Sequence, residues 1–275
     1  WKYLTFPEGL AAEVRHPSSP SAELDSAGIQ RAVDAAHRRG GGTVVVPAGD
    51  YLIGPIRLPS RVRLHLDPGA RLWASPNLED HRRGADDPIV PSMRRAKAPY
   101  AALPSDPLRA LISAGEAEDV AVTGDGEIRG QSPVWVFPWM NGNPTTQGPP
   151  ERGSHLLLFQ RCRRVRVSGI RLIDAPTWTI VLDECAGAEL RGIVMHHFDV
   201  VNADGIDLVG SSDVTIADCR LHVMDDAICL KTVHPDQVVR RVAVANCVLR
   251  TLCNGLKVGT ESLGGFEDIT FSNIV

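Results

Sequence analysis

The chain has 275 residues, of which 43% are hydrophobic and 23% are charged, and its formal net charge is −4. This length fits one or two domains, and the composition is that of an ordinary globular protein. The charge gives no reason to expect a nucleic-acid partner, and no apolar run reaches the roughly 18 residues of a membrane helix, so we expect no membrane partner.

The first predicted element is a helix over residues 25–39. Asp25 and Ser26 offer an N-cap, and Gly40-Gly41-Gly42 ends the helix. An apolar stripe of helical spacing runs along one face and consists of Ile29, Ala32, Val33 and Ala36. We expect this helix to cover one end of the structure that follows.

Short strands separated by turns follow the helix. They are predicted at residues 43–46, 51–53, 62–66 and 71–73, with Pro and Gly between them. Residues 76–105 are polar and without periodicity, and we expect a surface loop there. A second excursion, at 131–153, carries Trp135 and Trp139, which are candidates for a binding role because such residues gather on loops.

One five-residue phrase recurs along the rest of the chain. Val120-Ala-Val122-Thr-Gly124 is repeated in similar form from residues 165, 188, 214, 242 and 269, at spacings of 23 to 28 residues after the second copy. Repeats of this length indicate stacked coils of an all-β solenoid, because one unit cannot bury its own apolar face.

We expect a single domain over residues 1–275 that lacks its C-terminal coils, because Val275 ends in the middle of a phrase. An open coil exposes unpaired backbone and apolar side chains. A longer chain or a contact with another chain at this end would cover them.

The six cysteines lie between residues 162 and 253, and Cys219 and Cys247 occupy equivalent positions 28 residues apart. We interpret them as reduced packing residues, with one or two disulfides as the alternative. The sequence holds no CxxC pair, so we expect no structural zinc. No metal and no cofactor are predicted.

Three polar residues occupy the same point of successive units. Asp204, Asp226 and Asn254 are each followed by apolar residues two and four places later, and Trp178 stands at the same point one unit earlier. Adjacent strands lie roughly 4.8 Å apart, so Asp204 and Asp226 would crowd together with Asp225. Such crowding is costly unless the carboxylates perform chemistry or bind a cation.

These segments resemble known motifs. Asn202-Ala203-Asp204-Gly205 is similar to the Asn-Thr-Asp-Gly motif of the polygalacturonase family, glycoside hydrolase family 28, and Met224-Asp225-Asp226 to its Gly-Asp-Asp motif. Residues 253–260 are similar to Gly-His-Gly-x-Ser-Ile-Gly-Ser. Residues 29–72 and 122–130 resemble the coils of pectin-degrading β-helices. The resemblance implies a right-handed, single-stranded parallel β-helix of the pectin-lyase-like superfamily, and a secreted or periplasmic protein.

The same resemblance implies an inverting glycoside hydrolase acting on a pectic or other uronic-acid-containing polysaccharide or oligosaccharide. Asp225 would be the general acid, and Asp204 and Asp226 would activate water. Three clustered carboxyls would titrate as a unit, which keeps one of them protonated near neutral pH. The residues expected to bind substrate are Asn202, Asn254, Lys257, Trp178 and Lys231.

Two departures mark a divergent member. The family's His is Asn254, which cannot carry a proton, and the family's Arg-x-Lys motif is absent up to Val275. Lys257 stands where the family has Ser and could supply a cation. Two alternatives remain open. One is a polysaccharide lyase in which these carboxylates hold Ca²⁺ and Lys257 is the base; the other is a non-catalytic carbohydrate-binding β-helix.

Overall fold

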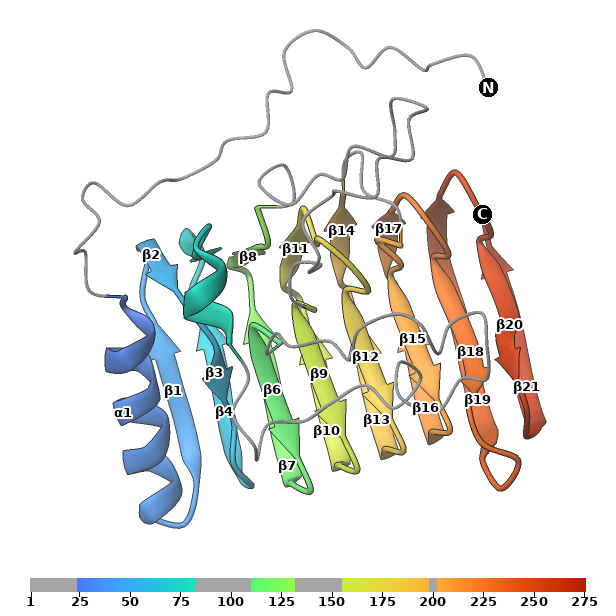
Figure 1. The fold of residues 1–275 in the computed structure, drawn as a ribbon, viewed down its shortest axis with the longest axis horizontal. Helices are drawn as coiled ribbons and strands as arrows, with labels where there is room; N and C mark the ends of the chain where they lie inside the picture. The colour runs from blue at the N-terminus through green and yellow to red at the C-terminus, as the bar shows by residue number, and fades with distance from the viewer. Residues whose placement is uncertain (1–23, 83–109, 132–154, 198–201) are drawn as a thin grey trace, which may run out of the picture.

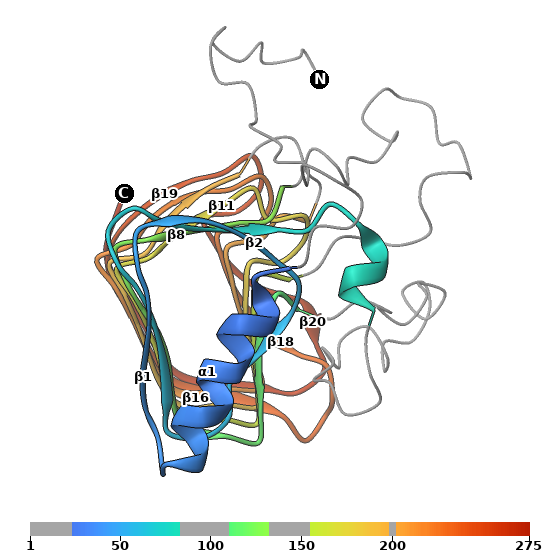
Figure 2. The ribbon, with the colours of Figure 1, turned by 90° about the vertical axis from the view of Figure 1, so that its left-hand side faces the viewer.

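The computed structural model describes residues 24–82, 110–131, 155–197 and 202–275. They form an elongated stack of coils, with helix α1 (Ser26–Arg38) at one end and the strands nearest the C-terminus at the other (Figure 1). Viewed along the stack, successive coils superpose around a common core (Figure 2).

Each regular coil contributes one strand to each of three parallel sheets. Sheet A contains β1 (Gly42–Val46), β4 (Val62–Leu66), β7 (Glu118–Gly124), β10 (Arg163–Ser168), β13 (Ala186–Arg191), β16 (Ser212–Ala217), the first part of β19 (Val238–Arg250) and β21 (Gly265–Ile274). Sheet B contains β2 (Gly49–Ile53), β5 (Ala70–Ala74), β8 (Glu127–Arg129), β11 (Arg171–Ile173), β14 (Val194–His196), β17 (Arg220–His222) and the last part of β19. Sheet C contains β3 (Ile56–Arg57), β6 (Ile112–Gly115), β9 (Leu157–Gln160), β12 (Ile180–Asp183), β15 (Ile206–Val209), β18 (Ile228–Thr232) and β20 (Leu256–Ser262).

The strand register confirms the repeated phrase. Residues 120, 165, 188, 214, 242 and 269 stand beside one another in sheet A. The turn from sheet A to sheet B takes a left-handed backbone in each of these coils, at Gly124, Gly169, Gly192, Asp218, Asn246 and Asn273. Gly, Asn and Asp accept this conformation most readily, which explains why these residue types recur at the end of the phrase.

The core lies inside the stack, where alternate side chains of every sheet meet. Leu64, Val122, Leu190 and Ile216 of sheet A are fully buried, as are Leu182 and Leu208 of sheet C. This alternation is the period of two that a strand imposes. A second, smaller apolar cluster lies on the outer side of sheet C and includes Leu158, Val181 and Val209. The architecture is the right-handed parallel β-helix that the sequence predicted.

Helix α1 lies across the N-terminal end of the stack and buries Val33 and Ala36 against it (Figure 2). Asp25 takes the N-cap position, as predicted, but its side chain makes no capping hydrogen bond. Asp25 is itself helical in backbone conformation, and its Oδ2 accepts a hydrogen bond from the Leu52 N–H at 2.8 Å. The Ser26 hydroxyl accepts one from the Gly54 N–H at 3.2 Å. Both side chains therefore join the helix to the first coil instead of capping it.

Part of the predicted loop at 76–105 is ordered as a short 3₁₀ helix, η1 (Leu78–His81). Its residues 83–105, and the excursion at 131–153 apart from Gln131, lie outside the described residues, as do Trp135 and Trp139. All six cysteines are free thiols, as expected: five are buried and Cys253 is exposed. In the described part of the chain, helices with the length and apolar character that a membrane crossing requires are absent.

Candidate active site

The column of polar residues lies in the loops that join sheet B to sheet C in successive coils. Backbone hydrogen bonds connect its members directly. The Thr179 N–H donates to the Asp204 carbonyl at 3.0 Å, Gly205 N–H to the Asp226 carbonyl at 2.9 Å, and Ala227 N–H to the Asn254 carbonyl at 2.8 Å. The alignment predicted from the sequence spacing is therefore present as physical stacking.

Asp226 is held by two side chains of the following coil. Asn254 Nδ2 donates to its Oδ1 at 2.7 Å, and Lys257 Nζ lies 2.7 Å from its Oδ2. Burial by itself would raise the pKa of Asp226, but the hydrogen bonds from Lys257 and Asn254 outweigh it and hold the pKa below its usual value. Asp226 is therefore ionised at neutral pH. Lys257 and the column residue Asn254 thus both contact the Asp226 carboxylate.

Asp225 is half-buried and has different neighbours. The Asn202 backbone N–H donates to its Oδ2 at 3.2 Å, and the Thr251 hydroxyl donates to its backbone carbonyl. Within the described residues no cation pairs with its carboxyl group. Of the three predicted catalytic aspartates, Asp225 is thus the most accessible, and unlike Asp226 it has no lysine partner among the described residues.

Asp204 is only 2% exposed, and its Oδ1 has no hydrogen-bond partner among the described residues. Burial raises its pKa well above the usual value, and the nearby Asp207 carboxylate raises it further, whereas Lys231 acts in the opposite direction. Asp204 consequently binds a proton much more tightly than Asp226 does. Their surroundings therefore give the carboxyl groups of Asp204 and Asp226 different proton affinities.

A buried ion-pair network lies beside the column. Asp207 is fully buried, and Lys231 Nζ lies 3.6 Å from its Oδ1 and 3.2 Å from Oε2 of Glu261. Burial raises the pKa of Asp207 to about 7, although Lys231 opposes this shift. The ammonium of Lys231 also lies 4.4 Å from the ring centre of Trp178.

This network involves two of the residues predicted to bind substrate. Lys231 was expected to bind substrate, but it is 4% exposed and its charge is used by Asp207 and Glu261. Trp178 was expected as a stacking platform for a sugar, but it is 6% exposed and packs against Lys231. Both sit behind the column. Asp207 is completely enclosed as well, although no local signal in the sequence indicates this.

Ligand atoms of Asp225, Asp226 and Cys253 lie within 4.8 Å of one another. Burial raises the pKa of the Cys253 thiol to about 12, with hydrogen bonds to the two carboxylates adding to the effect. In the metal-free site the thiol therefore stays protonated.

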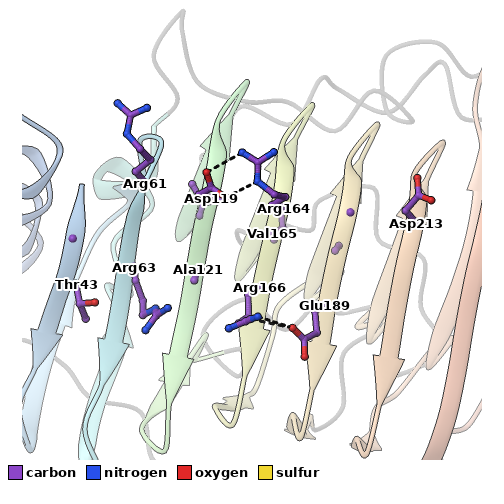
Figure 3. A pocket seen from close by; sticks show the side chains of 14 residues that line it. Thr43, Arg61, Arg63, Asp119, Ala121, Arg164, Val165, Arg166, Glu189 and Asp213 are labelled. Carbon is purple, nitrogen blue, oxygen red and sulfur yellow. Dashed lines mark hydrogen bonds and ion pairs between the residues drawn. The ribbon is translucent and has the colours of Figure 1, made fainter. Parts of the chain in front are cut away.

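A separate hollow of about 640 Å³ lies on the outer face of sheet A and is lined by arginines (Figure 3). Arg164 pairs with Asp119 at 2.6 Å, and Arg166 pairs with Glu189 at 3.0 Å. None of the predicted site residues lines this hollow. These two ion pairs join adjacent coils, so we attribute to them a structural role.

A parallel β-helix that presents stacked carboxyl groups on the loops along one edge defines a class of carbohydrate-active proteins. Residues 42–235 match the model of the glycosyl hydrolases family 28, and the chain belongs to that family.

Named relatives agree with this membership. The chain is 25% identical over 248 residues to a probable polygalacturonase of Vitis vinifera, an alignment that covers 86% of this chain and 48% of the relative. It is 22% identical over 257 residues to an endo-polygalacturonase of Pectobacterium carotovorum subsp. carotovorum, covering 90% and 60%. The chain therefore spans less than two thirds of the length of these relatives.

A solved structure is similar in fold. The polygalacturonase from Erwinia carotovora ssp. carotovora superposes with a TM-score of 0.73 at 20% identity, covering 95% of this chain and 71% of that one. At this identity the likeness concerns the fold.

Proposed function

We propose that this chain carries the catalytic carboxyls of an inverting glycoside hydrolase that cleaves a pectic or other uronic-acid-containing polysaccharide or oligosaccharide. The observation that carries the proposal is the stacking of Asp204, Asp225 and Asp226 at one edge in three unlike environments. An inverting hydrolase needs one carboxyl that donates a proton and another that activates water. Environments that separate proton affinities provide such a division.

In this proposal Asp225 is the general acid, because it is accessible and has no lysine partner among the described residues. Asp226 is the base that is ionised at neutral pH, held in place by Lys257 and Asn254. Asp204 is the second base by its place in the motif shared with the family; because burial raises its pKa, it must release its proton before it can activate water. Asn202 fixes Asp225 through its backbone N–H, and Asn254 holds Asp226 through its side-chain amide.

The lyase alternative is less well supported. It requires Lys257 to act as a neutral base, but the ammonium of Lys257 is bonded to Asp226. Burial would lower the pKa of Lys257, yet the hydrogen bond with Asp226 outweighs this and raises it. A lysine with a raised pKa is a poor proton acceptor at neutral pH.

Asp225→Asn tests the assignment. The amide oxygen can still accept the Asn202 N–H, but the side chain can no longer donate a carboxylic proton. We expect reducing-end release from pectic oligosaccharides to fall about 10²- to 10⁴-fold with an unchanged unfolding midpoint. Asp236→Asn is a matched control, because that side chain is 90% exposed on a remote turn. Full activity in Asp225→Asn would refute the proposed acid.

The proposal that hydrolysis inverts the configuration at the anomeric carbon rests on the family alone. Ligand oxygens of Asp225 and Asp226 lie within 4.8 Å, closer than the roughly 6.5–9.5 Å typical of an inverting pair. The anomeric proton of the first product, followed by NMR, distinguishes inversion from retention, and an unsaturated product would indicate a lyase. The single-domain organisation and the secreted or periplasmic location stay predictions.

A further inference from the structure

A continuous hydrogen-bond chain runs behind the column and ends on the backbone of Asp204. The Ala175 N–H donates to Nδ1 of His197 at 3.2 Å. Nε2 of His197 lies 2.7 Å from the hydroxyl of Thr179, and this hydroxyl lies 2.7 Å from the carbonyl oxygen of Asp204. His197 and Thr179 are both fully buried.

The direction of each bond follows from the first. Because Nδ1 accepts a hydrogen bond from a backbone N–H, it carries no proton, so the proton of the neutral imidazole is on Nε2. Nε2–H then donates to the Thr179 oxygen, and the Thr179 hydroxyl donates to the Asp204 carbonyl. Burial lowers the pKa of His197 to about 3, which keeps the ring neutral.

Asp204 needs support of this kind because its side chain supplies little. Its Oδ1 has no partner among the described residues. The adjoining Gly205 lies so close to the next coil that a Cβ atom there would come within 2.3 Å of the Ala227 carbonyl oxygen. Asn202, two residues earlier, has a left-handed backbone with φ of 64°. The turn is therefore sharply constrained, and its peptide groups must be fixed by neighbours.

We propose that His197 and Thr179 are positioning residues for Asp204: together they fix the Asp204 carbonyl and, through it, the direction of the carboxylate. This inference rests on the proposed role of Asp204 in water activation. Both nitrogens of His197 are used by the chain of hydrogen bonds, so the ring does not replace the family's histidine as a proton carrier. It acts through Thr179 and does not touch the substrate.

Thr179→Val and Thr179→Ser form the matched pair of variants. Val keeps the shape but removes the hydroxyl, whereas Ser keeps the hydroxyl and removes the methyl group. In Thr179→Val we expect kcat to fall about 10- to 100-fold with KM within about twofold, because a displaced base loses its near-attack geometry. Thr179→Ser should retain most of the parent kcat. A changed KM with unchanged kcat, or equal losses in both variants, would overturn the inference.

Two readouts do not depend on turnover and separate this inference from the proposed function. Amide hydrogen exchange at Asp204–Ile206 should accelerate in Thr179→Val and stay at the parent level in Thr179→Ser. In the parent chain labelled with ¹⁵N-histidine, His197 should show a protonated Nε2 and stay neutral from pH 8 to about 4. A proton on Nδ1, titration between pH 5 and 7, or unchanged exchange in Thr179→Val would refute the positioning role even if the parent hydrolyses substrate. A parent that hydrolyses nothing while these readouts hold would refute the proposed function alone.

Discussion

Four aspartates lie in or beside the site, and their identical side chains have different surroundings: these are Asp204, Asp207, Asp225 and Asp226. Lys257 and Asn254 stabilise the charge of Asp226, Lys231 partly stabilises that of Asp207, and the carboxyl of Asp204 lacks a cation within hydrogen-bond distance among the described residues. At the scale of single residues, the acid–base properties of the site are therefore set by burial and by two lysines, one on β18 and one on β20.

Lys257→Met should destabilise the chain by about 1–3 kcal/mol at pH 7, because the buried Asp226 carboxylate loses a charged hydrogen bond at 2.7 Å. The pKa of Asp226 is lowered in the folded state, so this stabilisation is present above its unfolded pKa of about 4 and is lost as the pH falls through the folded value. Urea unfolding at pH 7, 5 and 3 measures the difference, with Lys257→Arg as the charge-preserving control. A difference that stays constant down to pH 3 would contradict this prediction.

Lys231→Met should lower the free energy of unfolding by more than Lys257→Met does, by about 3–5 kcal/mol at pH 8. The reason is that it leaves the fully buried Asp207 carboxylate without its cation. The pKa of Asp207 is about 7, raised chiefly by burial, and it rises further when Lys231 is removed. Below that pKa Asp207 takes up a proton, so the loss should be smaller at pH 5.5 than at pH 8.

The double variant Lys231→Met/Asp207→Asn is the control for this interpretation, since an amide at position 207 needs no counter-charge. It should regain a substantial part of the lost stability at pH 8 in urea unfolding. If the two substitutions are additive, the ion pair does not account for the effect.

At the scale of elements, the turns from sheet A to sheet B are stabilised by side-chain ladders between coils. Asn246 has φ of 56°, its Nδ2 donates to Asp218 Oδ1 at 3.2 Å, and its Oδ1 accepts from Asn273 Nδ2 at 3.0 Å. A left-handed conformation costs roughly 1–2 kcal/mol for an ordinary residue. Asn both tolerates the conformation and continues the ladder.

We expect Asn246→Ala to lower stability by about 1–2 kcal/mol, since it loses two hydrogen bonds and strains the backbone. Asn246→Gly relieves the backbone strain without restoring the hydrogen bonds, so it should lose less stability than Asn246→Ala. Thermal unfolding of the two variants separates the contributions. A glycine variant that is no more stable than the alanine variant would show that backbone conformation contributes little here.

At the scale of the whole molecule, each coil contacts only its neighbours, so stability is transmitted along the stack. Strands β12 and β15 pair on both sides, whereas within the described residues β21 pairs with β19 alone. Side chains near this end are more exposed, as with Phe271 at 40%.

Amide exchange measured by mass spectrometry should therefore be slowest over β12 and β15 and faster over β20 and β21. The gradient follows from the one-dimensional architecture, in which an end coil has one stabilising neighbour and an inner coil has two. Equal protection from α1 to β21 would mean that the stack unfolds as a single cooperative unit.

The sequence by itself determined the coil architecture, the position of the capping helix and the alignment of Asp204, Asp226 and Asn254. These depend on local periodicity, on turn residues at Gly124, Asn246 and their equivalents, and on a repeat length that fixes the register. All of this information is contained in short segments, which is why it can be read from them.

The tertiary structure alone decided how charges and hydrogen bonds are distributed around that column. Lys257 contacts Asp226 across 31 residues, Lys231 is enclosed between Asp207, Glu261 and Trp178, and Asp25 binds Leu52 instead of its own helix. Each of these outcomes depends on which side chain of one coil reaches which atom of the next, and on how much water remains there. Burial and inter-coil contact arise only when the coils are stacked, and the repeat pattern carries no record of them.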